Sequence, residues 1–155
     1  VDQGVYVNPT LHAIRHQVWH LENLKNTKGL SEKEDIDYQS LIDIYSSHTK
    51  LVSRMKDEGV TLVAGSDSAW LNYKMGEFPH ELEAMNSIGL SEMEVIKSAT
   101  LDSARSCQID AQTESIEKNK LADIIMIDGD PTKDISAMWK INEVFKDGEI
   151  VTGNK

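Results

Sequence analysis

Short apolar runs alternate with long helical patterns over residues 1–106, and this alternation limits the possible folds more than any other feature of the sequence. The run Val5–Val7 precedes two helical patterns, and a second run at residues 60–65 precedes two more. Strands that alternate with helices usually pair in parallel, because each helix carries the chain back across the sheet. The sequence therefore predicts an α/β fold for this part of the chain.

Polar residues, glycine and proline mark the ends of the predicted elements. Asn8-Pro9 ends the first strand, because the residue before a proline is held in the extended region. Capping boxes at Ser31–Glu34 and Ser91–Glu94 predict two helix starts, and Gly59 and Gly89 predict two helix ends. The longest predicted helix carries one apolar stripe, made of Leu41, Ile44, Tyr45, His48, Leu51, Val52 and Met55.

Residues 107–155 have a different pattern, with polar residues first and apolar runs later. The run Leu121–Asp128 predicts a strand that is buried on both faces over much of its length. Residues 141–151 predict a hairpin, in which Asp147-Gly148 adopts the left-handed backbone of a tight turn. We therefore expect a partial α/β domain at residues 1–106, followed by an all-β part.

The charge of the chain argues against two classes of partner. Sixteen basic and 26 acidic residues give a net charge of -10, which repels phosphate backbones and anionic lipid headgroups. We therefore expect no nucleic acid and no membrane as partners. The single cysteine, Cys107, excludes an internal disulfide and fits a reducing compartment, so we expect a cytoplasmic protein. The chain begins with valine, which indicates either a processed chain or a piece of a longer polypeptide.

Asp67 is the first candidate for a chemical role. It follows the predicted strand at residues 60–65 and lies between Ser66 and Ser68. The carboxyl end of a strand is where α/β folds commonly carry catalytic side chains. The carboxylate could ligate a metal or transfer a proton. The alternative is that Asp67 caps the next helix or closes a turn.

Three histidines recur at helical spacing in the first predicted helix. His12, His16 and His20 project from one side of that helix, and two imidazoles so placed can share a zinc ion. The alternative is a solvated helix face, because no carboxylate or cysteine nearby completes four zinc ligands.

The loop Gly76–Glu81 runs into a helix start and forms the third candidate. His80 or Glu77 could line a pocket there. The simpler explanation of Glu81 is a favourable interaction with the dipole of its own helix. Three further residues could touch a substrate: Ser68, Trp70 and Tyr73.

Several segments, taken in order, resemble the C-terminal part of amidohydrolase-superfamily enzymes, especially imidazolonepropionase-like and Xaa-Pro-dipeptidase-like members. They are Val60–Ser68, the helices opening at His80 and Ser91, Ser98–Arg105 and Glu114–Ile124. The resemblance implies the C-terminal portion of a metal-dependent-hydrolase (β/α) barrel, with Val5–Leu11 as its seventh strand and loop and Val60–Asp67 as its eighth strand. It also implies that residues 107–155 supply the closing strands of a small β-sandwich.

The resemblance assigns a role to Asp67. This residue matches the family's aspartate that ligates metal and moves a proton between the hydrolytic water and the leaving amine. It implies hydrolysis of a C–N bond in a small-molecule amide or peptide substrate, with a divalent metal, zinc being expected, in the intact enzyme. The family's other metal ligands lie on earlier strands that this chain does not contain. We therefore expect the isolated chain to be inactive and to hold no metal.

A second interpretation comes from the strands that are missing. A barrel sheet cut to two strands leaves both edges open, which favours pairing with another copy. We therefore expect a homo-oligomer. The alternative to an enzyme fragment is a non-catalytic oligomerising or binding module that is derived from the amidohydrolase fold, so whether this chain alone acts as an enzyme stays open.

Overall fold

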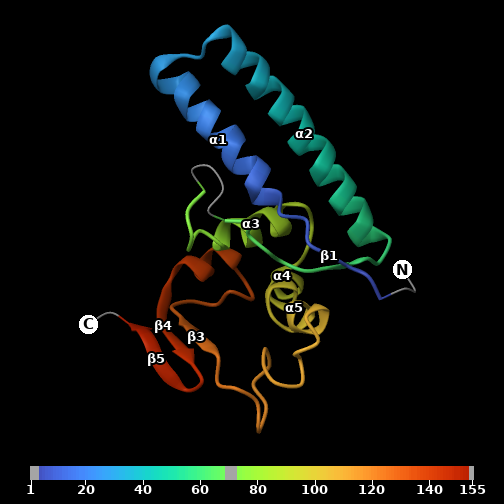
Figure 1. Cartoon of the computed structure of the whole chain (residues 1–155), viewed down its shortest axis with the longest axis vertical. Coiled ribbons are helices and arrows are strands. Elements are labelled where there is room, and N and C mark those ends of the chain that lie inside the picture. The colour runs from blue at the N-terminus through green and yellow to red at the C-terminus, as the bar shows by residue number, and fades with distance from the viewer. Residues whose placement is uncertain (1–3, 69–72, 154–155) are drawn as a thin grey trace.

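A hairpin of two long antiparallel helices projects from the rest of the molecule (Figure 1). In the computed structural model, which describes residues 4–68 and 73–153, the hairpin consists of α1 (Leu11–Lys28) and α2 (Glu32–Asp57). The capping box predicted before α2 is present, since the Ser31 side chain accepts from the Glu34 amide and the Glu34 carboxylate accepts from the Ser31 amide. This reciprocal pair satisfies two N–H groups that a helix start leaves free.

The apolar stripe predicted along α2 is only partly buried. Val52 is the buried residue of this helix among those described, whereas Ile44 and Leu51 are 53% and 48% exposed. The apolar stripe therefore does not face a core along its whole length. The physical reason is the projecting hairpin, in which α1 is the main neighbour along α2.

Two short parallel strands join the base of the hairpin to the rest of the chain. β1 (Tyr6–Val7) pairs with β2 (Thr61–Leu62), and Val63 N–H also donates to the Val7 carbonyl at 2.9 Å. The parallel pairing confirms the α/β prediction. The regular strand is shorter than the predicted run at residues 60–65, because β1 ends at Asn8-Pro9 and offers no further backbone partner.

Three helices follow β2 and form the centre of the molecule. They are α3 (Pro79–Ser87), α4 (Glu92–Ala99) and α5 (Leu101–Ser106). The first two begin where the sequence predicts, and Ser91 and Glu94 form the second capping box. The buried core draws on both halves of the chain, through Leu11, Val52, Leu62, Leu82, Ala84, Met85, Leu90, Val95 and Ile135.

The C-terminal part contains a three-stranded antiparallel sheet with the strand order β3-β4-β5. Its strands are β3 (Ile124–Ile127), β4 (Ile141–Lys146) and β5 (Glu149–Gly153). The predicted hairpin is confirmed, since Asp147 and Gly148 have φ of 52° and 83° at the turn between β4 and β5. The tail is not all-β, however, because the 3-10 helix η1 (Ile135–Trp139) lies between β3 and β4 and packs on α3.

The burial predicted for β3 is wrong. Ile124, Ile125 and Met126 are 36%, 42% and 47% exposed, although the sequence pattern predicts a strand covered on both faces. β3 is an edge strand of its sheet, and it lacks the covering layers that the pattern predicts within the part of the chain described. The predicted division of the chain at residue 106 stays a prediction. Among the helices of residues 4–68 and 73–153, none is both long enough and apolar enough to span a lipid bilayer.

Candidate functional site

Asp67 lies beyond the carboxyl end of β2, where the sequence predicts a site. Since β1 and β2 are parallel, their carboxyl ends meet at one edge of the sheet. Asp67 has a φ of 48°, in the left-handed region that aspartate tolerates better than most residues. Ser68 N–H donates to the Ser66 hydroxyl at 3.3 Å and helps to close the turn around it. The carboxylate is exposed, so it is available to a ligand or a substrate at this edge.

Asn8 reaches the same edge from β1. Its carboxamide lies directly over Gly65, so a Cβ atom placed on Gly65 would be 2.0 Å from Asn8 Nδ2. A side chain at position 65 would therefore require the Asn8 carboxamide to move. The contact joins the segment after β1 to the turn that carries Asp67. Asn8 is exposed, and its sequence pattern indicates only a strand end, not a site residue.

Glu81 is fully buried, and this overturns the explanation offered for it from the sequence. Its Oε1 accepts from Leu11 N–H at 2.9 Å, and its Oε2 accepts from His12 N–H at 2.6 Å. The carboxylate thus caps α1 rather than acting only on the dipole of α3. Burial raises the pKa of Glu81, while the two amide donors and the Arg15 guanidinium act in the opposite direction.

His12 is also fully buried, so the prediction of a solvated histidine face is wrong at this position. Arg15 Nε donates to His12 Nδ1 at 3.0 Å, and because arginine only donates, the ring proton lies on Nε2. That Nε2 atom has no hydrogen-bond partner among the described residues. Burial, followed by the charge of Arg15, lowers the pKa of His12 to about 3, so the ring is neutral at physiological pH.

The predicted zinc site at the three histidines receives no support from the geometry. The rings of Trp19 and Tyr73 pack edge-on against His12, at centroid distances of 5.2 and 4.7 Å. His20, by contrast, is exposed. Within residues 4–68 and 73–153, no group of three or more His, Cys, Asp or Glu side chains is arranged to hold a metal ion.

His80 takes part in a polar contact between α3 and η1. Its Nδ1 lies 3.1 Å from Glu83 Oε2, while Trp139 Nε1 donates to Glu83 Oε1 at 2.7 Å. Arg15 adds a hydrogen bond to the His80 carbonyl oxygen. These contacts connect α1, α3 and the C-terminal part, so His80 serves packing in this arrangement.

Tyr73 belongs to the core rather than to an open surface. It is only 2% exposed, and its hydroxyl donates to the Glu77 carbonyl oxygen at 3.5 Å. Burial, with Glu81 and Glu77 adding negative charge nearby, raises the pKa of Tyr73 to about 12, so the phenol stays protonated. Of the other two predicted substrate contacts, Ser68 lies beside Asp67, and Trp70 lies outside the described residues.

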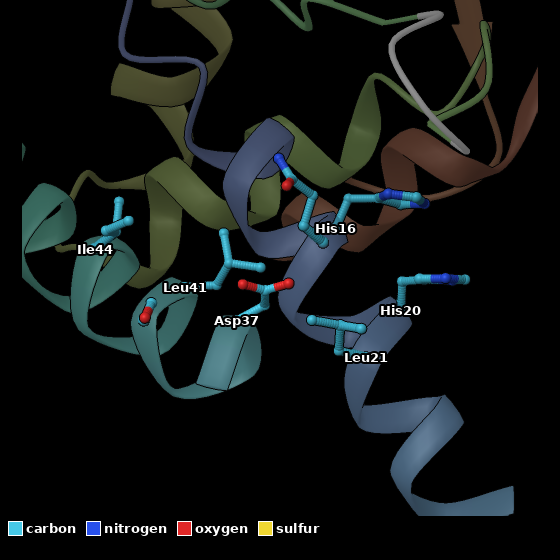
Figure 2. A pocket seen from close by; sticks show the side chains of 8 residues that line it. His16, His20, Leu21, Asp37, Leu41 and Ile44 are labelled. Carbon is cyan, nitrogen blue, oxygen red and sulfur yellow. The ribbon is translucent and has the colours of Figure 1, made fainter. Parts of the chain in front are cut away.

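A cavity of about 470 Å³ lies between the two helices of the hairpin (Figure 2). Figure 2 shows the imidazoles of His16 and His20 extending from the same side of α1, with Asp37 and Leu41 contributed by α2. Asp67 does not line this cavity. This cavity and the predicted catalytic carboxylate therefore occupy different places in the described structure, and the site around Asp67 is an open edge.

The family model and the similar solved structures agree with each other. The sequence matches the model for the Amidohydrolase family over residues 1–151. A solved Xaa-Pro dipeptidase with bound methionine in its active site is similar with a TM-score of 0.81 and 25% identity, over 98% of this chain and 36% of that one. A putative prolidase from Bifidobacterium longum shares the fold with a TM-score of 0.80 and 22% identity, over 97% of this chain and 36% of the prolidase.

Molinate hydrolase also shares the fold, with a TM-score of 0.65 and 21% identity, over 94% of this chain and 32% of the hydrolase. None of the curated proteins compared with the chain matches it. The chain therefore spans 32% to 36% of the length of these three solved structures.

Proposed function

Because the chain belongs to the amidohydrolase family, we propose that it forms the C-terminal portion of a metal-dependent enzyme that hydrolyses a C–N bond. In this proposal β1 and β2 are the last strands of a (β/α) barrel, and the β3–β5 sheet closes a small β-sandwich. The substrate would be a cyclic amide, a dipeptide or a related small molecule. The observation that carries the proposal is the exposed carboxylate of Asp67 at the carboxyl end of a parallel strand.

The residues described do not by themselves form a metal site. One carboxylate supplies too few ligands for an open catalytic site, and no cluster of three metal-binding side chains lies within residues 4–68 and 73–153. We propose that Asp67 is one ligand of a divalent metal, zinc being the expected ion, and that residues outside this chain supply the others. When bound, the metal would activate water and polarise the substrate carbonyl. The isolated chain would accordingly be inactive.

Asp67 would also move the proton that hydrolysis requires. Its carboxylate would accept a proton from the attacking water as the C–O bond forms. It would then deliver that proton to the leaving nitrogen as the C–N bond breaks, so that the departing group is a neutral amine. The exposed position of Asp67 at the end of β2 gives both the water and the leaving nitrogen access to the same carboxylate.

The test uses the polypeptide translated from the longest reading frame that contains this sequence, supplied with zinc. Asp67→Asn should lower kcat for hydrolysis of a panel of dipeptides and cyclic amides by about 10² to 10⁴-fold. KM should change far less, because the substitution keeps the size of the side chain. Metal content, measured by elemental mass spectrometry, separates a ligand role from a purely proton-transferring role. Near-normal turnover by Asp67→Asn would contradict the proposed role of Asp67 in metal binding and proton transfer.

A second candidate is a non-catalytic module that associates through its exposed apolar surface. It is favoured by Ile125, Met126 and Ile150, which are 42%, 47% and 59% exposed on one sheet. The same reading frame distinguishes the candidates. A preceding coding stretch with a His-x-His pair near its start favours the enzyme, and a reading frame without such a stretch favours the module.

A further inference from the structure

The start of α1 lacks a cap of its own. The first N–H groups of a helix have no partner within the helix and are usually satisfied by the side chain just before it. Here that residue is Thr10, whose side chain makes no capping hydrogen bond. Thr10 also has a φ of 44°, which is unusual for a β-branched residue. The strained backbone between β1 and α1 is therefore held by contacts from another part of the chain and not by a local cap.

Glu81 provides the missing cap from a distant part of the chain. Its two carboxylate oxygens accept from the amides of Leu11 and His12, at 2.9 and 2.6 Å. Hydrogen bonds to a charged acceptor are roughly twice as strong as neutral ones. The carboxylate is fully buried, so water does not compete for these two amides.

The cap connects the two segments that leave the candidate site. Residues 8–10 run from the end of β1 into α1, and the chain from β2 passes through Asp67 before it reaches α3. At the strand ends, Asn8 packs on Gly65. At the starts of the two helices, Glu81 of α3 accepts hydrogen bonds from the first turn of α1. The two segments are therefore in contact near the strands and joined by hydrogen bonds at the helix starts.

We infer that Glu81 is a positioning residue, which holds residues 8–10 and thereby the turn carrying Asp67 in the geometry that hydrolysis requires. The inference rests on the function proposed for Asp67. Glu81 touches neither a substrate nor a metal in this role; it acts through the backbone of α1 and the Asn8–Gly65 contact. Since a displacement of about 1 Å at a reacting group can cost about 10²-fold in rate, loss of this constraint should appear in catalysis and not only in stability.

The experiment compares three variants in the polypeptide from the longest reading frame. Glu81→Gln keeps the size of the side chain but offers one acceptor and one donor where two acceptors are needed. Glu81→Asp keeps the charge and serves as a partial rescue. Glu34→Gln is the matched control, because Glu34 also accepts from a backbone amide, that of Ser31 at 2.8 Å, but at the start of α2 near the tip of the hairpin.

Two readouts are measured for each variant. Hydrogen exchange should show that the Leu11 and His12 amides exchange about tenfold faster in Glu81→Gln, in keeping with the loss of about one charge-assisted hydrogen bond. In the same variant kcat should fall by about tenfold or more with little change in KM, and Glu81→Asp should recover part of it. Glu34→Gln should change neither readout at these positions.

The outcomes separate this inference from the proposed function. Faster exchange at Leu11 and His12 with unchanged kcat would show a purely structural cap and overturn the inference, as would unchanged exchange. If the wild-type polypeptide hydrolyses none of the substrates, or Asp67→Asn keeps full activity, the proposed function fails instead. The NMR signals of the Asp67 carboxyl and the Asn8 carboxamide then decide the inference: they should shift in Glu81→Gln but not in Glu34→Gln, and unchanged signals would overturn it.

Discussion

The junction between α1 and α3 buries its side chains, whereas the sheet β3–β5 leaves several apolar side chains exposed. At the junction, Leu82, Glu81 and His12 are all fully buried, and the carboxylate of Glu81 has a backbone donor for each oxygen. In the sheet, Ile125 and Ile150 remain 42% and 59% exposed. At the junction the Glu81 carboxylate is satisfied within the described chain, although the buried His12 Nε2 has no hydrogen-bond partner there. The sheet instead leaves apolar surface that further chain or another copy would cover.

This difference teaches which parts of the molecule depend on their surroundings. Buried polar groups with satisfied hydrogen bonds hold one arrangement, because breaking it leaves charges or donors unpaired. Exposed apolar strands gain little stability from contacts with their own neighbours. They would gain more from a partner that buries their apolar surface. The candidate edge with Asp67 adjoins the first kind of region, as expected if the turn that carries Asp67 is preorganised for the proposed hydrolysis.

Truncation of a core side chain in each region gives the largest expected contrast. Leu82→Ala should lower the free energy of unfolding by about 2 to 5 kcal/mol, because Leu82 has no exposed surface and the change leaves a cavity. Ile125→Ala should cost less than about 1 kcal/mol, because much of its side chain already faces water. Urea unfolding of both variants measures the difference. Equal losses would show that the sheet is as fully packed as the junction.

Sequence patterns were sufficient to predict the elements whose hydrogen bonds and turns involve only neighbouring residues. The capping box at Ser31–Glu34 and the turn at Asp147-Gly148 involve neighbouring residues, so both could be predicted, and both are present. The place of Asp67 at a strand's carboxyl end follows from the same kind of pattern. Its role as ligand and proton carrier stays a prediction, since a role depends on groups beyond the local sequence.

Contacts between distant segments could not be predicted in the same way. The partners of Glu81 are the amides of Leu11 and His12, and nothing near Glu81 in sequence indicates them. The burial of β3 was predicted wrongly for a related reason, because an apolar strand pattern shows that a strand can be covered but not what covers it. The only sequence signal for the Glu81 cap was negative, namely a helix start after Thr10 without the usual capping pattern.

Acid should weaken the junction through His12. Its pKa is lowered from 6.5 to about 3 in the folded chain, so the unfolded chain takes up a proton first as the pH falls. The stability that neutral His12 provides is therefore present above about pH 6.5, and it is lost by up to about 1.4 kcal/mol per pH unit on the way down to about pH 3.

His12→Gln should remove this dependence while keeping a polar side chain. Urea unfolding between pH 8 and pH 4 should give a shallower loss for the variant than for the wild type. His16, whose pKa burial also lowers, and Glu81, whose raised pKa acts with the opposite sign, titrate in both proteins and largely cancel in the difference. Parallel curves for the two proteins would contradict the assignment to His12.

Placing a charge on the sheet β3–β5 should have the smallest effect on stability. It is also the most direct test of whether this exposed sheet is a contact surface. If β3–β5 is a contact surface between copies, the wild-type chain should gain mass by light scattering over an about tenfold rise in concentration. Ile125→Lys should then reduce this self-association with little change in the unfolding midpoint, because a desolvated charge disfavours the contact but not the exposed strand. Ile116→Lys is the matched control, since Ile116 is 90% exposed and lies outside the sheet. A wild-type monomer across the whole range would refute the predicted homo-oligomer, whereas equal weakening by both lysines would attribute association to net charge rather than to this sheet.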